Sequence, residues 1–486
     1  MSRRFDPSEP IGRGHTVIEA SAGTGKTFTI AAIVARLIAE EGVPIDRILL
    51  ITFTRAATAE LKARVRNRLV AVVEAIEGGA RGGDAHMEAL LSSIPHAGIL
   101  DRVGTALTHF DRAQVFTIDG FGRRLLGELG FGSRLPVELE PGGIDRSLVS
   151  EIASDYVLDR YAFSTDRLIP VTHASEIGVA VTARPDAVVV PDPGRVMGVA
   201  AARAEVAAHM RTEIERRLRR GNRVTFTDSL LEVWATLADS AIGDDARRLL
   251  AGRYEIGLVD EAQDTDPTQW KVILDIFRDG RLVIIGDPKQ SIYRFRGADV
   301  DAYLEAAQRA ERRTLDTNWR ADQPLLDALD ALLAGATLGH ESIGYHRVHA
   351  PEVHRQARLV GAGPSLSIRW FAGDTPIQPR NRDDTFPVRA ARAAAAADAA
   401  SEAVRLLSAR TSLLEDDGSE VRALTYVVRE PKKGLTTSQA YTKHMLDGLI
   451  EAEVPAQYIR YVTRRIAKNN PILKKWVTAY RGDQSR

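Results

Sequence analysis

The sequence predicts an α/β fold built on a parallel sheet, and two observations carry this prediction. Apolar, β-branched runs of strand length alternate with helical patterns between residues 15 and 80, and strand-like runs return at 254–260 and 281–286. Such runs are typical of buried parallel strands joined by helices. The segment 20–27, ASAGTGKT, stands between the first run and its helix. A Gly-rich turn from a strand into a helix is typical of phosphate-binding loops.

The Gly-rich segment supplies the groups that a phosphate chain needs. Its glycines allow a tight turn in which successive N–H groups point inward, and the following helix adds its positive N-terminal end. Lys26 is placed to reach the β- and γ-phosphates, and the Thr27 hydroxyl is placed to ligate Mg²⁺. The alternative is a chance Gly-rich turn, and Ala20 does replace the usual first glycine. The predicted phosphate-binding residues are Ala20, Ser21, Ala22, Gly23, Thr24, Gly25, Lys26 and Thr27.

The chain between this loop and residue 221 predicts further sheet elements and then a helical region. The run 47–53 reads as a buried strand, 54–76 has helical periodicity, and 113–118 reads as another short strand. The helical pattern carries a cationic face at Arg55, Lys62, Arg64, Arg66 and Arg68. Residues 125–221 hold helical stretches around the Pro- and Val-rich segment 183–196, which predicts an inserted helical domain.

Two later strand-like runs bring polar groups to the same sheet edge. The run 254–260 ends in Asp260 and the run 281–286 is followed directly by Asp287, and ligands bind at the carboxyl ends of parallel strands. In a nucleotide hydrolase Asp260 would hold Mg²⁺ and Glu261 would polarise the attacking water. The alternative for this acidic pair is a helix N-cap.

The segment 290–296 suggests contacts to phosphate and to single-stranded nucleic acid. Gln290, just past a strand end, is placed to bond the γ-phosphate or the attacking water. Tyr293, Arg294, Phe295 and Arg296 interleave rings with cations, and single strands bind by base stacking and phosphate pairing. The alternative is two rings facing the core with two solvated arginines.

Composition excludes some classes of function. The 486 residues carry 65 basic and 65 acidic side chains, so any nucleic-acid surface must be local. The absence of cysteine excludes disulfides, thiolate zinc sites and cysteine nucleophiles. The polar first residues show no signal-peptide core, and no apolar run approaches membrane-spanning length. We therefore expect a soluble, cytoplasmic protein with no membrane partner.

Six segments in order resemble the UvrD-like helicases of superfamily one, and in particular the RecB type, the exonuclease V β-subunit. The resemblance covers residues of about 10–410, and the segments are IEASAGTGKT, ITFTRAATAELKARV, TIDGFGRRLL, VDEAQDTDPTQW, IIGDPKQSIYRFRGAD and LDTNWR. It implies a RecA-like P-loop NTPase sheet and an ATP-dependent DNA helicase acting in recombination and repair. The implied ligands are ATP, Mg²⁺ and single-stranded or tailed double-stranded DNA. The implied protein partners are other subunits of an exonuclease V-like complex.

The resemblance also implies roles for individual residues. Lys26, Asp260, Glu261, Gln290 and Arg320 match catalytic positions, with Arg320 as an arginine finger. Thr27 and Asp260 match the metal ligands, and Trp319 matches the aromatic that packs on adenine. Positions that match DNA contacts are Phe53, Thr54, Tyr293, Phe295 and Arg296. Asp119 replaces the histidine usual in its motif, which puts a DNA contact there in doubt.

The sequence after residue 411 departs from the helicase pattern. It contains neither a late Gly-rich DNA-binding motif nor a second arginine motif. Residues 421–475 resemble the last part of a γ-glutamylcyclotransferase-like fold, and an unrelated basic helical tail is the alternative. The expected domains are 1–124 and 222–312 for the first RecA-like domain, 125–221 for the insertion, 313–411 for an incomplete second RecA-like domain, and 412–486 for the tail. Two functions stay open: a helicase, or an ATP- and ssDNA-binding module that does not unwind DNA.

Overall fold

The structure is a computed structural model, and it divides the chain into two units. The first comprises Met1–Asn318 and Gly335–Val348, and the second comprises Trp319–Ala334 and His349–Arg486. The described residues are 3–6, 9–78, 84–93, 95–130, 140–141, 146–162, 169–183, 188–220, 223–224, 226–294, 297–370, 387–408, 411–414 and 419–422.

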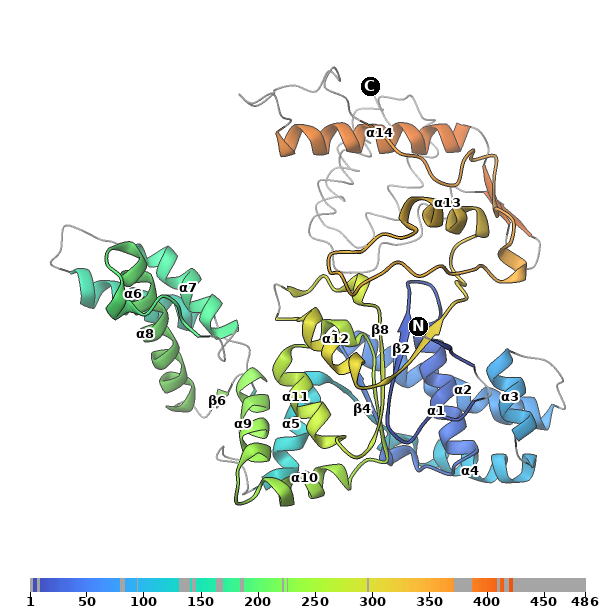
Figure 1. The fold of residues 1–486 in the computed structure, drawn as a ribbon, viewed down its shortest axis with the longest axis horizontal. Helices are drawn as coiled ribbons and strands as arrows, with labels where there is room; N and C mark the ends of the chain where they lie inside the picture. Colours follow the sequence, from blue (N-terminus) through green and yellow to red (C-terminus); the bar gives the residue numbers. More distant parts are fainter. Residues whose placement is uncertain are drawn as a thin grey trace, which may run out of the picture. The chain divides into compact units, whose positions relative to one another are not determined.

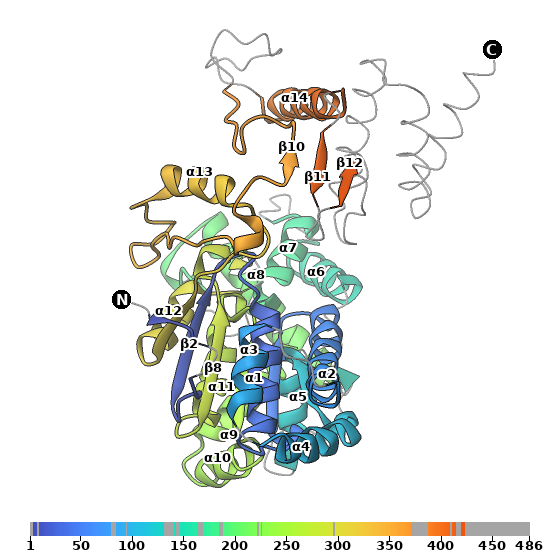
Figure 2. The same ribbon diagram turned by 90° about the vertical axis from the view of Figure 1, so that its right-hand side faces the viewer.

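A parallel sheet forms the centre of the first unit (Figure 1, Figure 2). Its strand order is β1-β9-β2-β8-β7-β3-β4, and all of the pairs between them are parallel. The strands are β1 (Arg3–Arg4), β2 (His15–Ala20), β3 (Ile48–Thr52), β4 (Gln114–Thr117), β7 (Ile256–Val259), β8 (Arg281–Gly286) and β9 (Glu311–Leu315). The predicted α/β fold with a parallel sheet is confirmed.

Helices cover both faces of this sheet. One face carries α1 (Lys26–Ala39), α2 (Arg55–Glu77), α3 (Ala85–Ser93) and α4 (His96–Thr108). The other carries α5 (Ile118–Leu129), α9 (Phe226–Ala238), α10 (Gly243–Ala251), α11 (Pro267–Ile276) and α12 (Val300–Gln308). Successive strand residues alternate between two buried clusters: Ile48 and Leu50 join the first, whereas Leu49 and Ile51 join the second. Burial on both faces explains why the strands are apolar throughout.

The strand that contains Arg313 belongs to this first sheet. β9 pairs with β2 along residues 311–315 and also with β1. The boundary that the sequence suggests between 312 and 313 therefore falls inside a strand. The pairing joins segments almost three hundred residues apart, so no local pattern reveals it.

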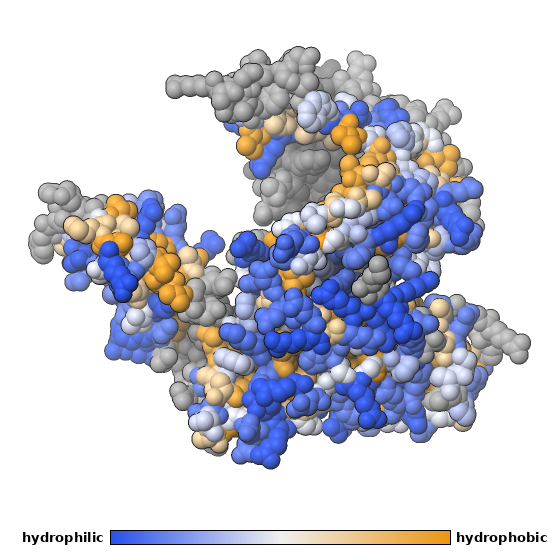
Figure 3. Space-filling view, viewed as in Figure 1, coloured by the Kyte–Doolittle hydropathy of each residue, from blue (hydrophilic) through white to orange (hydrophobic). Residues whose placement is uncertain are grey.

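The inserted helices form a cluster with a core of its own. They are α6 (Arg146–Tyr161), α7 (Val171–Ala183) and α8 (Val199–Arg220), and their buried side chains are separate from the two sheet cores. Short strands β5 (Glu140–Pro141) and β6 (Arg223–Val224) pair in parallel where the chain enters and leaves this region. Figure 3 shows apolar patches on these helices, and the segment before α8 exposes Val188, Val190 and Met197.

The described residues of the second unit form two α-helices, a short 3-10 turn (Glu352–His354) and a small antiparallel sheet. The helices are α13 (Gln323–Leu333) and α14 (Val388–Ser408), and the sheet order is β10 (Leu359–Val360), β11 (Ser412–Leu414) and β12 (Glu420–Arg422). Most of the segment compared with a cyclotransferase-like fold lies outside the described residues. In the described part of the chain, no helix is both long and apolar enough to cross a membrane.

Candidate nucleotide and DNA site

The Gly-rich loop connects β2 to α1 and leaves the start of the helix open. Gly23 and Gly25 have φ values of 83° and 86°, a left-handed conformation that favours glycine. Gly25 occupies the N-cap position, and no side chain caps the helix there. The first turn of α1 contains no acidic residue. The loop therefore offers backbone donors and the positive end of a helix to an anion.

Lys26 forms an ion pair with Glu261 across the carboxyl edge of the sheet. The distance from Lys26 Nζ to Glu261 Oε2 is 2.7 Å, and the lysine side chain is 11% exposed. Glu261 follows β7, which lies two strands from β2 in the sheet. The fold thus brings together the phosphate-loop lysine and the candidate general base, 235 residues apart in sequence.

Asp260 is a buried carboxylate beside this pair. Its Oδ1 accepts a hydrogen bond of 2.9 Å from the Glu261 backbone N–H. Burial, and after it the negative charge of Glu261, raise the pKa of Asp260 to about 6, while the positive charge of Lys26 opposes the shift. A raised carboxyl pKa in a ligand-binding edge is typical of functional sites.

The raised pKa of Asp260 predicts that Asp260→Asn stabilises the protein. Because burial disfavours the charged form, ionised Asp260 costs folding free energy that is absent below about pH 4 and complete above about pH 6. The shift sets an upper limit of about 3 kcal/mol on the gain. We expect thermal unfolding in EDTA to show a higher Tm for Asp260→Asn at about pH 8, with a smaller gain at about pH 5. A gain that does not depend on pH would contradict this explanation.

Glu261 has a backbone conformation that side-chain-bearing residues rarely adopt. Its φ of 50° makes it the only non-glycine residue with positive φ in the described part of the chain. Such a conformation costs on the order of 1–3 kcal/mol and persists where the surrounding structure enforces it, often in active sites.

Gln263 and Asp287 extend the contacts of Glu261 to Gln290. Gln263 Nε2 donates to Glu261 Oε2 at 2.9 Å, and its Oε1 accepts from the Asp287 N–H at 2.9 Å. Asp287 in turn accepts from Gln290 Nε2 at 2.6 Å and pairs with Lys289 at 2.6 Å. The structure therefore links three of the predicted catalytic residues, Lys26, Glu261 and Gln290, in one hydrogen-bond network. Sequence reasoning did not identify Gln263, and only its proximity to Glu261 could have suggested it.

The described candidates for DNA contact lie just after two strands. Phe53, after β3, and Tyr293, after β8, stack with ring centroids 5.1 Å apart and planes at 29°. Thr54 caps α2, since its side chain accepts from the Ala57 N–H at 3.1 Å. Phe295 and Arg296 lie outside the described residues. Phe53 and Tyr293 are both partly exposed, so their rings form a small stack at the surface.

The segment after β9 leads to the second unit. Asn318 Nδ2 donates to the Ala22 carbonyl at 2.9 Å, so this segment contacts the phosphate loop within the first unit. Trp319 and Arg320 belong to the second unit, and Trp319 is 58% exposed there. The packing of Trp319 on adenine and the role of Arg320 as an arginine finger remain predictions.

The predicted cationic face of α2 is only partly solvated. Arg68 pairs with Asp84 and lies 5.1 Å from the centre of the Phe28 ring. Arg64 pairs with Glu60 one turn away. Arg55 and Arg66 are exposed.

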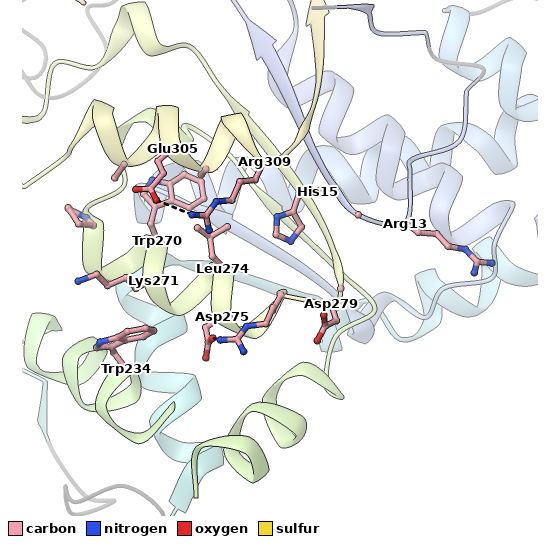
Figure 4. A pocket seen from close by; sticks show the side chains of 16 residues that line it. Arg13, His15, Trp234, Trp270, Lys271, Leu274, Asp275, Asp279, Glu305 and Arg309 are labelled. Atoms are coloured by element: carbon pink, nitrogen blue, oxygen red, sulfur yellow. Dashed lines mark hydrogen bonds and ion pairs between the residues drawn. The ribbon is translucent and has the colours of Figure 1, made fainter. Parts of the chain in front are cut away.

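A hollow of about 670 Å³ begins beside the amino ends of β2 and β8 and extends along α11 and α12. It is lined by His15 at the start of β2, Gly280 just before β8, and residues of α9, α11 and α12 (Figure 4). Trp270 and Trp234 contribute its rings, and Lys271 Nζ lies 5.9 Å from the centre of the Trp234 ring. Its lining includes none of residues 20–27, so it is separate from the Gly-rich loop.

The parallel sheet, together with the Gly-rich loop and the polar residues at its carboxyl edge, defines a P-loop nucleotide-binding protein of the α/β class. The model of the UvrD/REP helicase N-terminal domain matches residues 6–311, and the chain belongs to this family. It is 38% identical over 368 residues to the RecBCD enzyme subunit RecB of Mycobacterium tuberculosis (strain CDC 1551 / Oshkosh), covering 74% of this chain and 33% of the relative.

Two further relatives carry the same name. The RecBCD enzyme subunit RecB of Mycolicibacterium smegmatis is 40% identical over 359 residues, which are 73% of this chain and 32% of the relative. That of Escherichia coli (strain K12) is 24% identical over 461 residues, covering 69% and 39%. The chain thus spans about a third of the length of the mycobacterial relatives.

Proposed function

We propose that this chain is the ATP-binding motor part of a RecB-type DNA helicase, and that it binds single-stranded DNA. The hydrogen-bond network at the sheet edge supports this proposal most strongly. It runs from Lys26 through Glu261 and Gln263 to Asp287 and Gln290. It connects the phosphate loop to the loop that carries Tyr293. Such a connection is what a motor needs if ATP hydrolysis is to respond to DNA.

The residues at the sheet edge fit Mg²⁺ bound with ATP. Asp260 is a carboxylate whose pKa is raised by burial and by the charge of Glu261, so a cation beside it would be favourable. Hard oxygen ligands of this kind suit Mg²⁺. Asp260 and the Thr27 hydroxyl would hold the metal. When bound, Mg²⁺ would neutralise charge on the phosphates.

Hydrolysis would use the chain's own residues in a defined order. Lys26 would move from Glu261 to the β- and γ-phosphates, which frees one lone pair of the Glu261 carboxylate. Glu261 would then accept the proton of the attacking water while the γ-phosphate leaves ADP. Gln290 would contact the γ-phosphate or the water, Trp319 would pack on adenine, and Arg320 would act as an arginine finger.

The proposed DNA contacts are Phe53, Thr54, Tyr293, Phe295 and Arg296. Stacking of bases on rings supports sequence-tolerant binding, which a translocating protein requires. As further partners we propose other subunits of a complex, because the relatives are named as subunits of the RecBCD enzyme. Exposed apolar side chains such as Val188 and Met197 are of the kind that protein interfaces cover.

The test is an ATPase measurement on the purified 486-residue chain with and without ssDNA, beside strand displacement on a tailed duplex. We expect Mg²⁺-dependent hydrolysis that ssDNA accelerates. Failure to bind an ATP analogue with Mg²⁺ would refute the proposal. Strand displacement separates the two functions left open by the sequence: ATP-dependent unwinding supports a helicase, whereas ATP and ssDNA binding without unwinding supports a binding module.

A further inference from the structure

Gln263 has a buried side chain whose amide nitrogen and amide oxygen both form hydrogen bonds. It lies in a short helical turn, Ala262–Asp264, and is 2% exposed. The Asp287 N–H can only donate, which fixes Oε1 on that side and turns Nε2 toward the Glu261 carboxylate. The side chain therefore bridges the segment after β7 to the end of β8.

The backbone around Gln263 also holds the loop that follows β8. Ser291 Oγ donates to the Gln263 carbonyl at 3.2 Å, and the Asp299 N–H donates to the Thr265 carbonyl at 3.4 Å. Tyr293 lies between these two attachments. We call the described residues 291–294 the Tyr293 loop. A displacement of this loop would therefore act on the turn that contains Gln263.

The fit between Gln263 and the end of β8 is close. A Cβ atom added at Gly286 would come 2.7 Å from Gln263 Oε1 and 3.3 Å from the Ala262 N. Contacts of this kind leave little room for the amide to shift while β8 stays in place. A movement of Asp287 would therefore also move the Gln263 amide, because close packing leaves no free volume between them.

Gln263 becomes more important once a nucleotide is bound. In the structure, Glu261 Oε2 accepts from both Lys26 and Gln263. If Lys26 turns to the phosphates, Gln263 is the side-chain donor that continues to hold this carboxylate in the described part of the chain. The orientation of the general base would then depend on Gln263, and through it on Asp287.

We propose that Gln263 is a positioning residue that couples nucleotide binding and hydrolysis at Glu261 to DNA binding at the Tyr293 loop. DNA on this loop shifts the end of β8, and the amide passes that shift to the Glu261 carboxylate. The inference rests on the proposed function, since it requires that the chain bind both ATP and ssDNA. Gln263 itself touches neither substrate.

The experiment measures coupling by binding, so it does not depend on turnover. The affinity for a non-hydrolysable ATP analogue with Mg²⁺ is determined with and without saturating ssDNA, and the ratio of the two dissociation constants is the coupling factor. The variants are Gln263→Leu, which loses both amide bonds, and Gln263→Glu, which keeps the acceptor for Asp287 N–H but cannot donate to Glu261. Gln308→Leu, at an exposed glutamine at the end of α12, is the matched control.

We expect a coupling factor of about 5–150 for the parent chain and for Gln308→Leu, the range usual for linked sites. The factor should approach 1 in Gln263→Leu and fall in Gln263→Glu, while the affinity for ssDNA alone is retained. Retained affinity distinguishes a positioning role from general damage to the fold. Where turnover is measurable, kcat should lose its stimulation by ssDNA, with KM for ATP little changed.

Two results would overturn the inference. One is a coupling factor in Gln263→Leu equal to that of the parent chain, and the other is a parent chain that binds both ligands with no coupling. A parent chain that binds neither ligand would instead refute the proposed function, so the two failures are distinguishable. Gly286→Ala serves as a second variant. Its added Cβ would come 2.7 Å from Gln263 Oε1 and displace the amide, while every polar group is kept.

Discussion

Replacing Glu261 with Gln is expected to lower the rate of ATP hydrolysis by about 10²–10⁴-fold, the usual contribution of a general base. The amide keeps the size of the side chain and still accepts hydrogen bonds from Lys26 and Gln263, but it cannot take a proton from water. Binding of an ATP analogue should therefore be preserved. Single-turnover hydrolysis and analogue titration, made on the same preparation, measure the two effects separately.

The control for this variant is Glu255→Gln, just before the opposite end of β7. Glu255 pairs with Arg47 at 3.2 Å, and both side chains are substantially exposed, so its loss should not affect hydrolysis. A Glu261→Gln chain that hydrolyses ATP at a rate close to the parent's would remove Glu261 from the mechanism. Loss of analogue binding together with hydrolysis would assign it a binding role instead.

The sheet and the Gly-rich turn after β2 could be predicted from sequence because their signals are local. The strands expected at 47–53, 113–118, 254–260 and 281–286 appear as β3, β4, β7 and β8; the bounds of β8 are as expected, and those of the other three are one or two residues shorter at each end. Gly23 and Gly25 adopt the left-handed conformations for which a phosphate loop selects glycine. Continuous apolar runs and Gly-rich turns each report on a few consecutive residues, so one sequence suffices to find them.

The polar contacts of the site could not be predicted, because they join distant segments. Nothing near Lys26 indicates a partner at Glu261, and nothing in the segment around Gln263 indicates that its amide meets Asp287. Arg68 illustrates the same limit: helical periodicity puts it on a cationic face and indicates no partner, whereas the fold places it against Asp84 and Phe28. These contacts depend on strand order, which is set by the whole sheet and not by any single segment.

Replacing Lys26 with Ala is expected to weaken ATP binding by about 10- to 100-fold, since charged hydrogen bonds contribute about 1.5–3 kcal/mol. The structure adds a second reason for a loss. Lys26 is the positive group that opposes the raised pKa of Asp260, so its removal should raise that pKa further. More Asp260 would then be protonated at neutral pH, and the affinity for Mg²⁺ should fall as well.

Titration of an ATP analogue with and without Mg²⁺ separates the two effects of Lys26→Ala. Loss of the phosphate contact weakens binding in both conditions, whereas the effect through Asp260 appears only with Mg²⁺ and diminishes as the pH is raised. Lys271→Ala is the matched control, because Lys271 lies on α11 beside Trp234 and lines the hollow, not the Gly-rich loop. Unchanged affinity in the Lys26 variant would refute the assignment of residues 20–27 as the phosphate loop, and the proposed role of Lys26 would fail with it.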